Sequence, residues 1–156
     1  MAELKIALQL YTVRDLLSED YVGTLRKVKE IGYDIVQPTG HLPYEAAEMR
    51  RIFDDIGLEA AGLHIDGDRL RHELPRWMDY AEALGTRDLV WPYMEEKYRQ
   101  SREDWTSAAR IMDELGARCK EQGFRLSYHN HSFEFVRFGD IYALDLLYAH
   151  LSLIHI

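Results

Sequence analysis

The sequence has a single cysteine, Cys119, and no long apolar run. One cysteine excludes an internal disulfide and is typical of a protein from a reducing compartment. No apolar run reaches the roughly 18 residues that a membrane-spanning helix needs. The N-terminal residues MAELKIALQLYTVRD also lack the basic and then apolar segments of a signal peptide. We therefore expect a cytoplasmic protein with no membrane partner.

Positive charge is scarce as well. The 19 lysines and arginines against 27 aspartates and glutamates give a formal net charge of −8. This balance argues against a nucleic-acid partner, although local cations could still hold a small anionic substrate. Apolar residues make up 47% and charged residues 29% of the 156 residues, which is ordinary for one globular domain.

Short apolar runs alternate with longer stretches of helical periodicity. The runs predict strands at residues 5–11, 35–38, 58–64, 88–92 and 125–130. Helices are predicted between and after them at residues 18–31, 43–56, 70–84, 101–121 and 141–149. Ser18 is expected to begin the first helix, with Glu19 and Asp20 in its first turn. Repeated strand–helix pairs predict parallel strands with right-handed crossovers.

This repeat suits either a doubly wound sheet or a (β/α)8 barrel. The glycine fingerprint of a dinucleotide-binding fold is missing after the first strand, where the chain reads QLYTVRD, and this favours the barrel. A complete barrel takes about 250 residues. We therefore predict an α/β fold, an incomplete (β/α)8 TIM barrel of about five βα units with parallel strands, over residues 1–150.

The last six residues, LSLIHI at 151–156, follow the fifth predicted helix without a turn residue. They match one reading frame of a transposase end sequence that is used in preparing DNA libraries. We expect them to be a non-native tail. A natural sixth strand or an extension of the helix is the alternative.

Polar side chains stand at the carboxyl ends of the predicted strands, where the reactive groups of parallel barrels lie. Because side chains alternate along a strand, those of each strand that share one face point into the barrel together. The candidate substrate-binding residues chosen in this way are Gln9, Tyr11, Gln37, His64, His129 and His131.

The segment 128–135, YHNHSFEF, has the richest pattern. Its two histidines lie two residues apart on a strand, so both imidazoles face one side, which suits a divalent metal or hydrogen bonds to sugar hydroxyls. Glu134 follows in the next loop and could reach a metal above the barrel. The alternative is that these histidines, and His64, are hydrogen-bonded core or rim groups. Core packing is the favoured reading of Trp91 and Tyr93, ahead of an apolar wall for a sugar.

Several segments together resemble sugar phosphate isomerases and epimerases with the xylose isomerase-like TIM barrel. The resemblance covers residues 1–150 and is most specific in LQLYTVRD and YHNHSFEF. The other similar segments are GTLRKVKEIGYDIVQ, GLEAAGLHI and LVWPYMEEKYR.

The resemblance implies a divalent metal (Mn, Mg, Co or Zn) held by two glutamates, an aspartate and a histidine. Glu134 matches the glutamate near the fifth strand, which makes it the candidate metal ligand and catalytic group, and the other ligands are expected from later strands. Family second strands often end in glutamate where this chain has Gln37, which argues against a carboxylate there.

The implied chemistry is proton abstraction next to a carbonyl of a small sugar or sugar derivative, through an enediolate. A lyase or dehydratase acting on a keto-inositol or keto-glycoside is the alternative on the same barrel. An apurinic endonuclease would need further histidines and a basic surface, and only His64 fits. We expect this chain to be inactive by itself and to self-associate through unpaired sheet edges. A homo-oligomeric whole protein is a further expectation.

Overall fold

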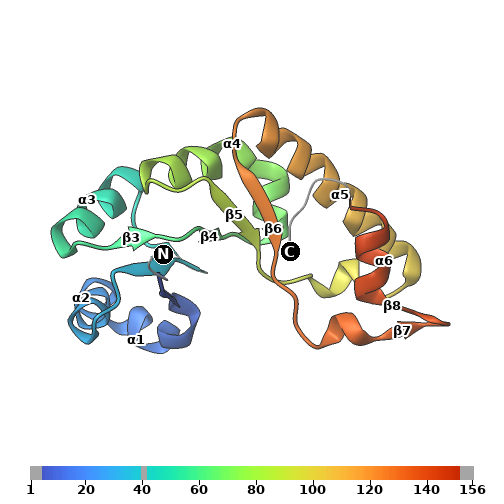
Figure 1. Ribbon diagram of the computed structural model, residues 1–156, viewed down its shortest axis with the longest axis horizontal. Coiled ribbons are helices and arrows are strands. Elements are labelled where there is room, and N and C mark those ends of the chain that lie inside the picture. Colours follow the sequence, from blue (N-terminus) through green and yellow to red (C-terminus); the bar gives the residue numbers. More distant parts are fainter. Residues whose placement is uncertain (1–4, 40–41, 152–156) are drawn as a thin grey trace.

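The computed structural model describes residues 5–39 and 42–151. Apart from Leu151, the predicted tail therefore lies outside the described residues. Figure 1 shows an arc, with the strands on its inner side and helices α3, α4 and α5 along its outer side. The helices are α1 (Arg14–Glu19), α2 (Tyr21–Ile31), α3 (Ala46–Ile56), α4 (Gly67–Ala83), α5 (Arg102–Glu121) and α6 (Ala143–Ala149).

Parallel strands run through the arc in sequence order. They are β1 (Ala7–Gln9), β2 (Ile35–Gln37), β3 (Glu59–Ala60), β4 (Leu63–His64), β5 (Asp88–Trp91) and β6 (Arg125–Tyr128). Each of the five predicted βα units is present, with β3 and β4 together forming the third strand. The predicted α/β fold, a partial TIM barrel with parallel strands, is confirmed.

The third predicted strand is divided at Gly62. The φ angle of Gly62 is 147°, in the region that glycine tolerates best, and a Cβ atom there would lie 3.1 Å from Asp88. The chain still follows β2 across this break. The His64 amide donates to the Pro38 carbonyl at 3.0 Å, and Thr39 forms a parallel bridge with His64. The break therefore brings His64 to the end of β4 with its strand pairing intact.

The helix after β1 begins differently from the prediction. Ser18 lies inside the short helix α1, and Asp20 is the N-cap of α2. Asp20 has extended backbone angles, and its carboxylate accepts a hydrogen bond from the Gly23 amide at 2.9 Å. The prediction that Ser18 begins the helix is wrong because the chain turns two residues later, where the aspartate satisfies the free amides.

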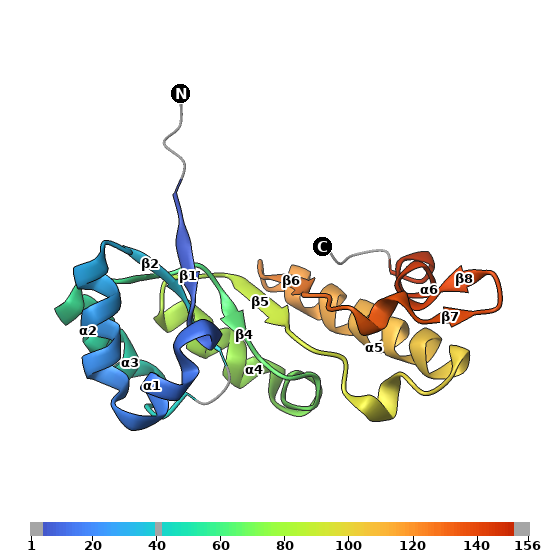
Figure 2. The same ribbon diagram turned by 90° about the horizontal axis from the view of Figure 1, so that it is seen from below.

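The region after β6 is more irregular than predicted. A short 3-10 helix, η3 (Phe133–Phe135), leads to an antiparallel hairpin of β7 (Arg137–Phe138) and β8 (Ile141–Tyr142). Figures 1 and 2 both show this hairpin projecting beyond α6 at one end of the arc. Because β8 takes the first two residues of the predicted helix, α6 starts at Ala143.

The core lies between the sheet and the outer helices. In β5 and β6 alternate residues are buried, so Leu89, Trp91, Leu126 and Tyr128 pack toward the helices. Trp105 of α5 is fully buried in this core. The intervening residues face the inner side of the arc, which is the side on which the barrel prediction places substrate. No helix in the described ranges combines the length and apolarity needed to cross a bilayer.

Candidate functional site

The carboxyl ends of the strands surround a cavity of about 540 Å³. This volume is in the range of small-molecule sites, about 300–1,000 Å³. The residues that line it are Gln9, Tyr11, Thr39, His64, Asp66, Pro92, Tyr93, His129 and His131. Five of the six predicted substrate-binding residues are thus brought together, although they are far apart in the sequence. Their role in binding stays a prediction.

Three histidines form a continuous array on the cavity wall. The His64 ring lies edge-on to the His129 ring, with centroids 5.3 Å apart. The His129 ring stacks on the His131 ring at 4.9 Å, with 14° between the planes. On the other side, Gln9 Nε2 is 3.4 Å from His64 Nδ1. Side chains from β1, β4 and the end of β6 are therefore linked through one chain of contacts.

Strand pairing explains the position of the array. The His129 amide donates to the Trp91 carbonyl at 3.0 Å, which extends the pairing of β6 with β5 by one residue. Tyr128 is buried toward the helices, so His129 points to the opposite, inner face. His131 is two residues further along and lies on the same side. The sequence alternation predicted this placement.

Burial sets the protonation state of His64. His64 is only 3% exposed, and this burial, with the nearby His129 and His131, lowers its pKa from 6.5 to about 4. The pKa of His129 is also lowered, first by burial and then by His131. His64 is therefore neutral at pH 7, with one ring nitrogen donating and the other accepting. Donation from Gln9 to Nδ1 leaves the ring proton on Nε2.

Aromatic side chains form the remaining wall. Tyr93 is 43% exposed and packs edge-on against His131 at 5.4 Å and against Phe133 at 5.0 Å. Tyr11 is 54% exposed at the other end of the cavity. Trp91 is fully buried, and its Nε1 donates to the Tyr93 carbonyl at 2.8 Å. The prediction of core packing is therefore confirmed for Trp91. It is wrong for Tyr93, which lies at the cavity surface.

Glu134, the predicted metal ligand and catalytic group, is fully buried in η3. Its Oε1 accepts a hydrogen bond from the Tyr128 hydroxyl, and its Oε2 accepts one from the His131 amide at 2.7 Å. Burial, followed by the contact with Glu134, raises the pKa of Tyr128. Glu134 does not line the cavity. The structure thus places it behind the histidines.

The divalent metal implied by the sequence resemblance needs several ligands close together. Within residues 5–39 and 42–151, no three His, Cys, Asp or Glu side chains lie close enough to hold a metal ion. The carboxylate predicted as a ligand already accepts two hydrogen bonds from the protein. The residues that the structure describes therefore do not fit a metal.

The lining of the cavity also differs from the predicted set of residues. Gln37 pairs with Gln9 in the sheet register but does not line the cavity. Thr39 and Asp66, which the sequence analysis did not select, do line it. Each lies two residues beyond the end of its strand, so a search extended past the predicted strand ends would have found both. Asp66 also caps α4 by accepting from the Arg69 amide at 3.0 Å.

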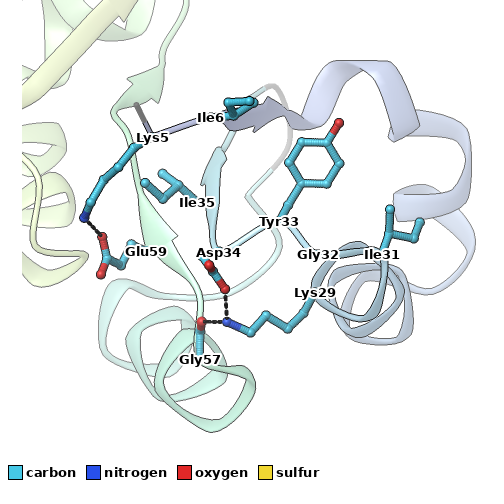
Figure 3. Close-up of a pocket in the computed structure, with 10 residues that line it drawn as sticks. All are labelled: Lys5, Ile6, Lys29, Ile31, Gly32, Tyr33, Asp34, Ile35, Gly57 and Glu59. Carbon is cyan, nitrogen blue, oxygen red and sulfur yellow. Dashed lines mark hydrogen bonds and ion pairs between the residues drawn. The ribbon is translucent and has the colours of Figure 1, made fainter. Parts of the chain in front are cut away.

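A second hollow of about 660 Å³ lies at the amino ends of β1, β2 and β3 (Figure 3). Lys29 Nζ donates to Asp34 Oδ1 at 2.5 Å and to the Gly57 carbonyl at 2.6 Å. Lys5 Nζ lies 3.5 Å from a Glu59 carboxylate oxygen. The charged groups drawn in Figure 3 are thus paired with each other, and this end of a barrel usually serves stability. The histidine-lined cavity is the candidate active site.

Comparison with known proteins gives one consistent family. Residues 25–149 match the family described as xylose isomerase-like TIM barrel. The rhizopine catabolism protein MocC of Rhizobium meliloti is 25% identical over 126 residues, covering 69% of this chain and 39% of MocC. The chain therefore spans well under half the length of this curated relative.

Solved structures show the same fold. A sugar phosphate isomerase/epimerase from Parabacteroides distasonis superposes with a TM-score of 0.80 at 19% identity, covering 99% of this chain and 67% of that one. A xylose isomerase-like TIM barrel protein from Mycobacterium smegmatis, in complex with magnesium, has a TM-score of 0.60 at 18% identity and coverages of 86% and 54%. An AP endonuclease of family 2 from Brucella melitensis has a TM-score of 0.64 at 14% identity, with coverages of 86% and 60%.

These structural similarities concern the fold, because the identities are low. The family match is broader evidence, since it extends over most of the chain and includes β2 to β6 and the histidine segment of the cavity. The fold built from the parallel strands agrees with it. This chain belongs to the xylose isomerase-like TIM barrel family.

Proposed function

We propose that this chain provides the sugar-binding wall of an enzyme that isomerises or epimerises a sugar by moving a proton next to a carbonyl. The observation that carries the proposal is the convergence of Gln9, Tyr11, His64, His129 and His131 on one cavity. The family membership supports an enzyme acting on a sugar. The activity of the whole protein is part of the proposal, because the chain covers only part of its relatives.

The groups in the cavity suit the hydroxyls of a cyclic or open-chain sugar. Imidazole and amide groups both donate and accept hydrogen bonds, as a sugar hydroxyl does. In its contact with Gln9, Nδ1 of the neutral His64 is the acceptor, which leaves Nε2 as the donor at pH 7. The exposed faces of Tyr11 and Tyr93 offer apolar surface for the C–H side of a sugar.

The charge of the cavity supports a neutral substrate over a phosphorylated one. Neither lysine nor arginine is among the residues that line it. The acidic group there, Asp66, lies 3.1 Å from Arg69 Nε in an ion pair. A phosphate group at this wall would be without the cations that normally bind it. We therefore propose a neutral keto-sugar or keto-polyol as the molecule that contacts these residues.

Proton transfer at this wall would fall to imidazole. His129 and His131 are the imidazoles of the array that are exposed at the cavity, so a substrate bound there can reach their ring nitrogens. We derive no step through a metal, since the described residues do not fit one.

A lyase or dehydratase remains the second candidate on the same barrel. The relative MocC is named for the catabolism of rhizopine rather than for an isomerisation, which favours keeping this class. The two classes differ in their products. An isomerase returns a sugar of unchanged composition, whereas a dehydratase releases water and leaves a product that is lighter by that amount. Mass spectrometry of the products from a panel of ketoses and keto-inositols separates them.

Binding to the chain tests the proposal directly. Neutral ketohexoses and their phosphate esters are titrated by calorimetry against the wild-type chain, the His129→Ala variant and the His72→Ala variant. His72 is exposed on α4 and serves as the matched control. We expect binding of the neutral sugar, weaker binding of the ester, and loss of binding only in His129→Ala. Equal binding to all three proteins would contradict the proposal.

Turnover gives a separate test of the expected inactivity of this chain. The chain is incubated with the same ketoses in deuterium oxide, with and without Mn²⁺. We expect no deuterium to enter the carbon next to the carbonyl. Deuterium incorporation together with micromolar Mn²⁺ affinity would show that this chain is active by itself.

A further inference from the structure

Glu134 is a carboxylate in an unusual setting. It is 0% exposed, and the ion pairs of the described residues do not include it. A carboxylate buried in this way is destabilising unless hydrogen bonds compensate for its lost hydration. Two donors provide that compensation here, the Tyr128 hydroxyl and the His131 amide. Hydrogen bonds to a charged acceptor are about twice as strong as neutral ones.

The two donors lie on either side of His129. Tyr128 is the last residue of β6, and His131 lies in the loop that follows. One carboxylate thus joins the end of the strand to the loop and closes the turn that carries both cavity histidines. The turn is fixed from the strand side as well, because the His129 amide donates to the Trp91 carbonyl at 3.0 Å.

The hydrogen bonds of Glu134 also help to align the rings of His129 and His131. His131 stacks on His129 at 4.9 Å and on Phe133 at 5.5 Å, with 14° and 9° between the planes. Phe133 is the first residue of η3, the short helix that contains Glu134. The carboxylate and the stacked rings therefore hold the same few residues.

We propose that Glu134 is a positioning residue that fixes the backbone of His131 and, through it, the stacked His129–His131 pair, and that it does not serve as a metal ligand in this chain. This role rests on the proposed function only in that the two histidines are the cavity groups being positioned. The contacts of the carboxylate themselves are independent of any substrate.

Substitution of Glu134 separates positioning from metal binding. Glutamine has one acceptor oxygen in place of two, so Glu134→Gln can satisfy only one of the two donors. The amide nitrogen of the glutamine then faces the other group, where the wild-type chain has an acceptor oxygen. Tyr128→Phe is the milder change, because it removes one hydrogen bond and leaves the bond between Glu134 and the His131 amide. Glu96→Gln is the matched control, since Glu96 is exposed in the first turn of another 3-10 helix, η2 (Glu96–Tyr98).

Nuclear magnetic resonance provides the readout without substrate. We expect the His131 amide proton to resonate downfield in the wild-type chain and to move upfield in Glu134→Gln. The ring signals of His129 and His131 should shift in both Glu134→Gln and Tyr128→Phe, and remain in place in Glu96→Gln. Unchanged ring signals in Tyr128→Phe, which is conservative enough to fold, would overturn the proposal.

A titration with Mn²⁺ alone tests the second part of the proposal, that Glu134 is not a metal ligand. We expect Glu134→Gln to leave the affinity of the chain for Mn²⁺ unchanged, whether that affinity is weak or strong. A loss of tenfold or more in Glu134→Gln, with Glu96→Gln unaffected, would make Glu134 a ligand and overturn the proposal. Failure of sugar binding with the amide and ring shifts as expected would instead count against the proposed function alone.

Discussion

Acidification from pH 7 to pH 5 should destabilise this chain through His64. The residue is 3% exposed, and its pKa falls from 6.5 to about 4 on folding because burial and the neighbouring His129 and His131 oppose its charge. Between these two values the unfolded chain binds a proton that the folded chain does not. The contribution of His64 is therefore constant above about pH 6.5 and becomes unfavourable as the pH falls toward 4.

The magnitude follows from the two pKa values. One pKa unit corresponds to about 1.4 kcal/mol. At pH 5 the unfolded imidazole is almost fully protonated and the folded one is mostly neutral, so the linkage amounts to about 2 kcal/mol. The lowered pKa of His129 has the same sign and adds to the acid sensitivity.

Urea unfolding at pH 7 and pH 5 measures the contribution of His64 to the free energy of unfolding. The wild-type chain, His64→Gln and His72→Gln are compared, because His72 is exposed on α4. We expect the wild type and His72→Gln to lose about 2 kcal/mol more between pH 7 and pH 5 than His64→Gln does. An equal loss in all three proteins, or a His64 ring signal that titrates near 6.5, would refute the reasoning.

Three further predictions concern stability and assembly. Ser101 accepts from the Asp104 amide at 3.1 Å in a capping box, so Ser101→Ala should lower the free energy of unfolding by about 1 kcal/mol in urea. A Cβ atom at Gly67 would lie 1.9 Å from the buried Trp91 ring, so Gly67→Ala should cost about 1–3 kcal/mol by overpacking and lower the melting temperature. In the described sheet β1 and β6 each pair on one side only, so light scattering should detect concentration-dependent self-association. A monodisperse monomer with a cooperative melt would contradict that prediction.

The alternation of apolar runs and helical periods was enough to predict the parallel fold. It worked because each strand has one face buried against helices, as the burial of Leu126 and Tyr128 illustrates. Helix starts were less predictable, since Ser18 and Asp20 are both good caps and only the extended backbone at Asp20 decides between them. The β7–β8 hairpin could not be predicted, because strands of two residues have no readable period.

The candidate site was predictable where strand geometry dictates it. His64, His129 and Gln9 reach the cavity because side chains alternate and parallel strands end at one edge. The position of Glu134 was not predictable, because its burial depends on a hydrogen bond from Tyr128, six residues away, across a turn of irregular backbone. A carboxylate near a strand end reads the same in sequence whether it faces the cavity or lies behind it.

The central claim is that the histidine array forms a binding wall for a neutral sugar, and ring-proton resonances test it most directly. A neutral ketohexose is titrated into the wild-type chain while the ring signals of His64, His129, His131 and His72 are followed. We predict that the three array histidines shift together with one dissociation constant and that His72, exposed on α4, does not move. Shifts that are absent from the array, or equal at His72, would contradict the account.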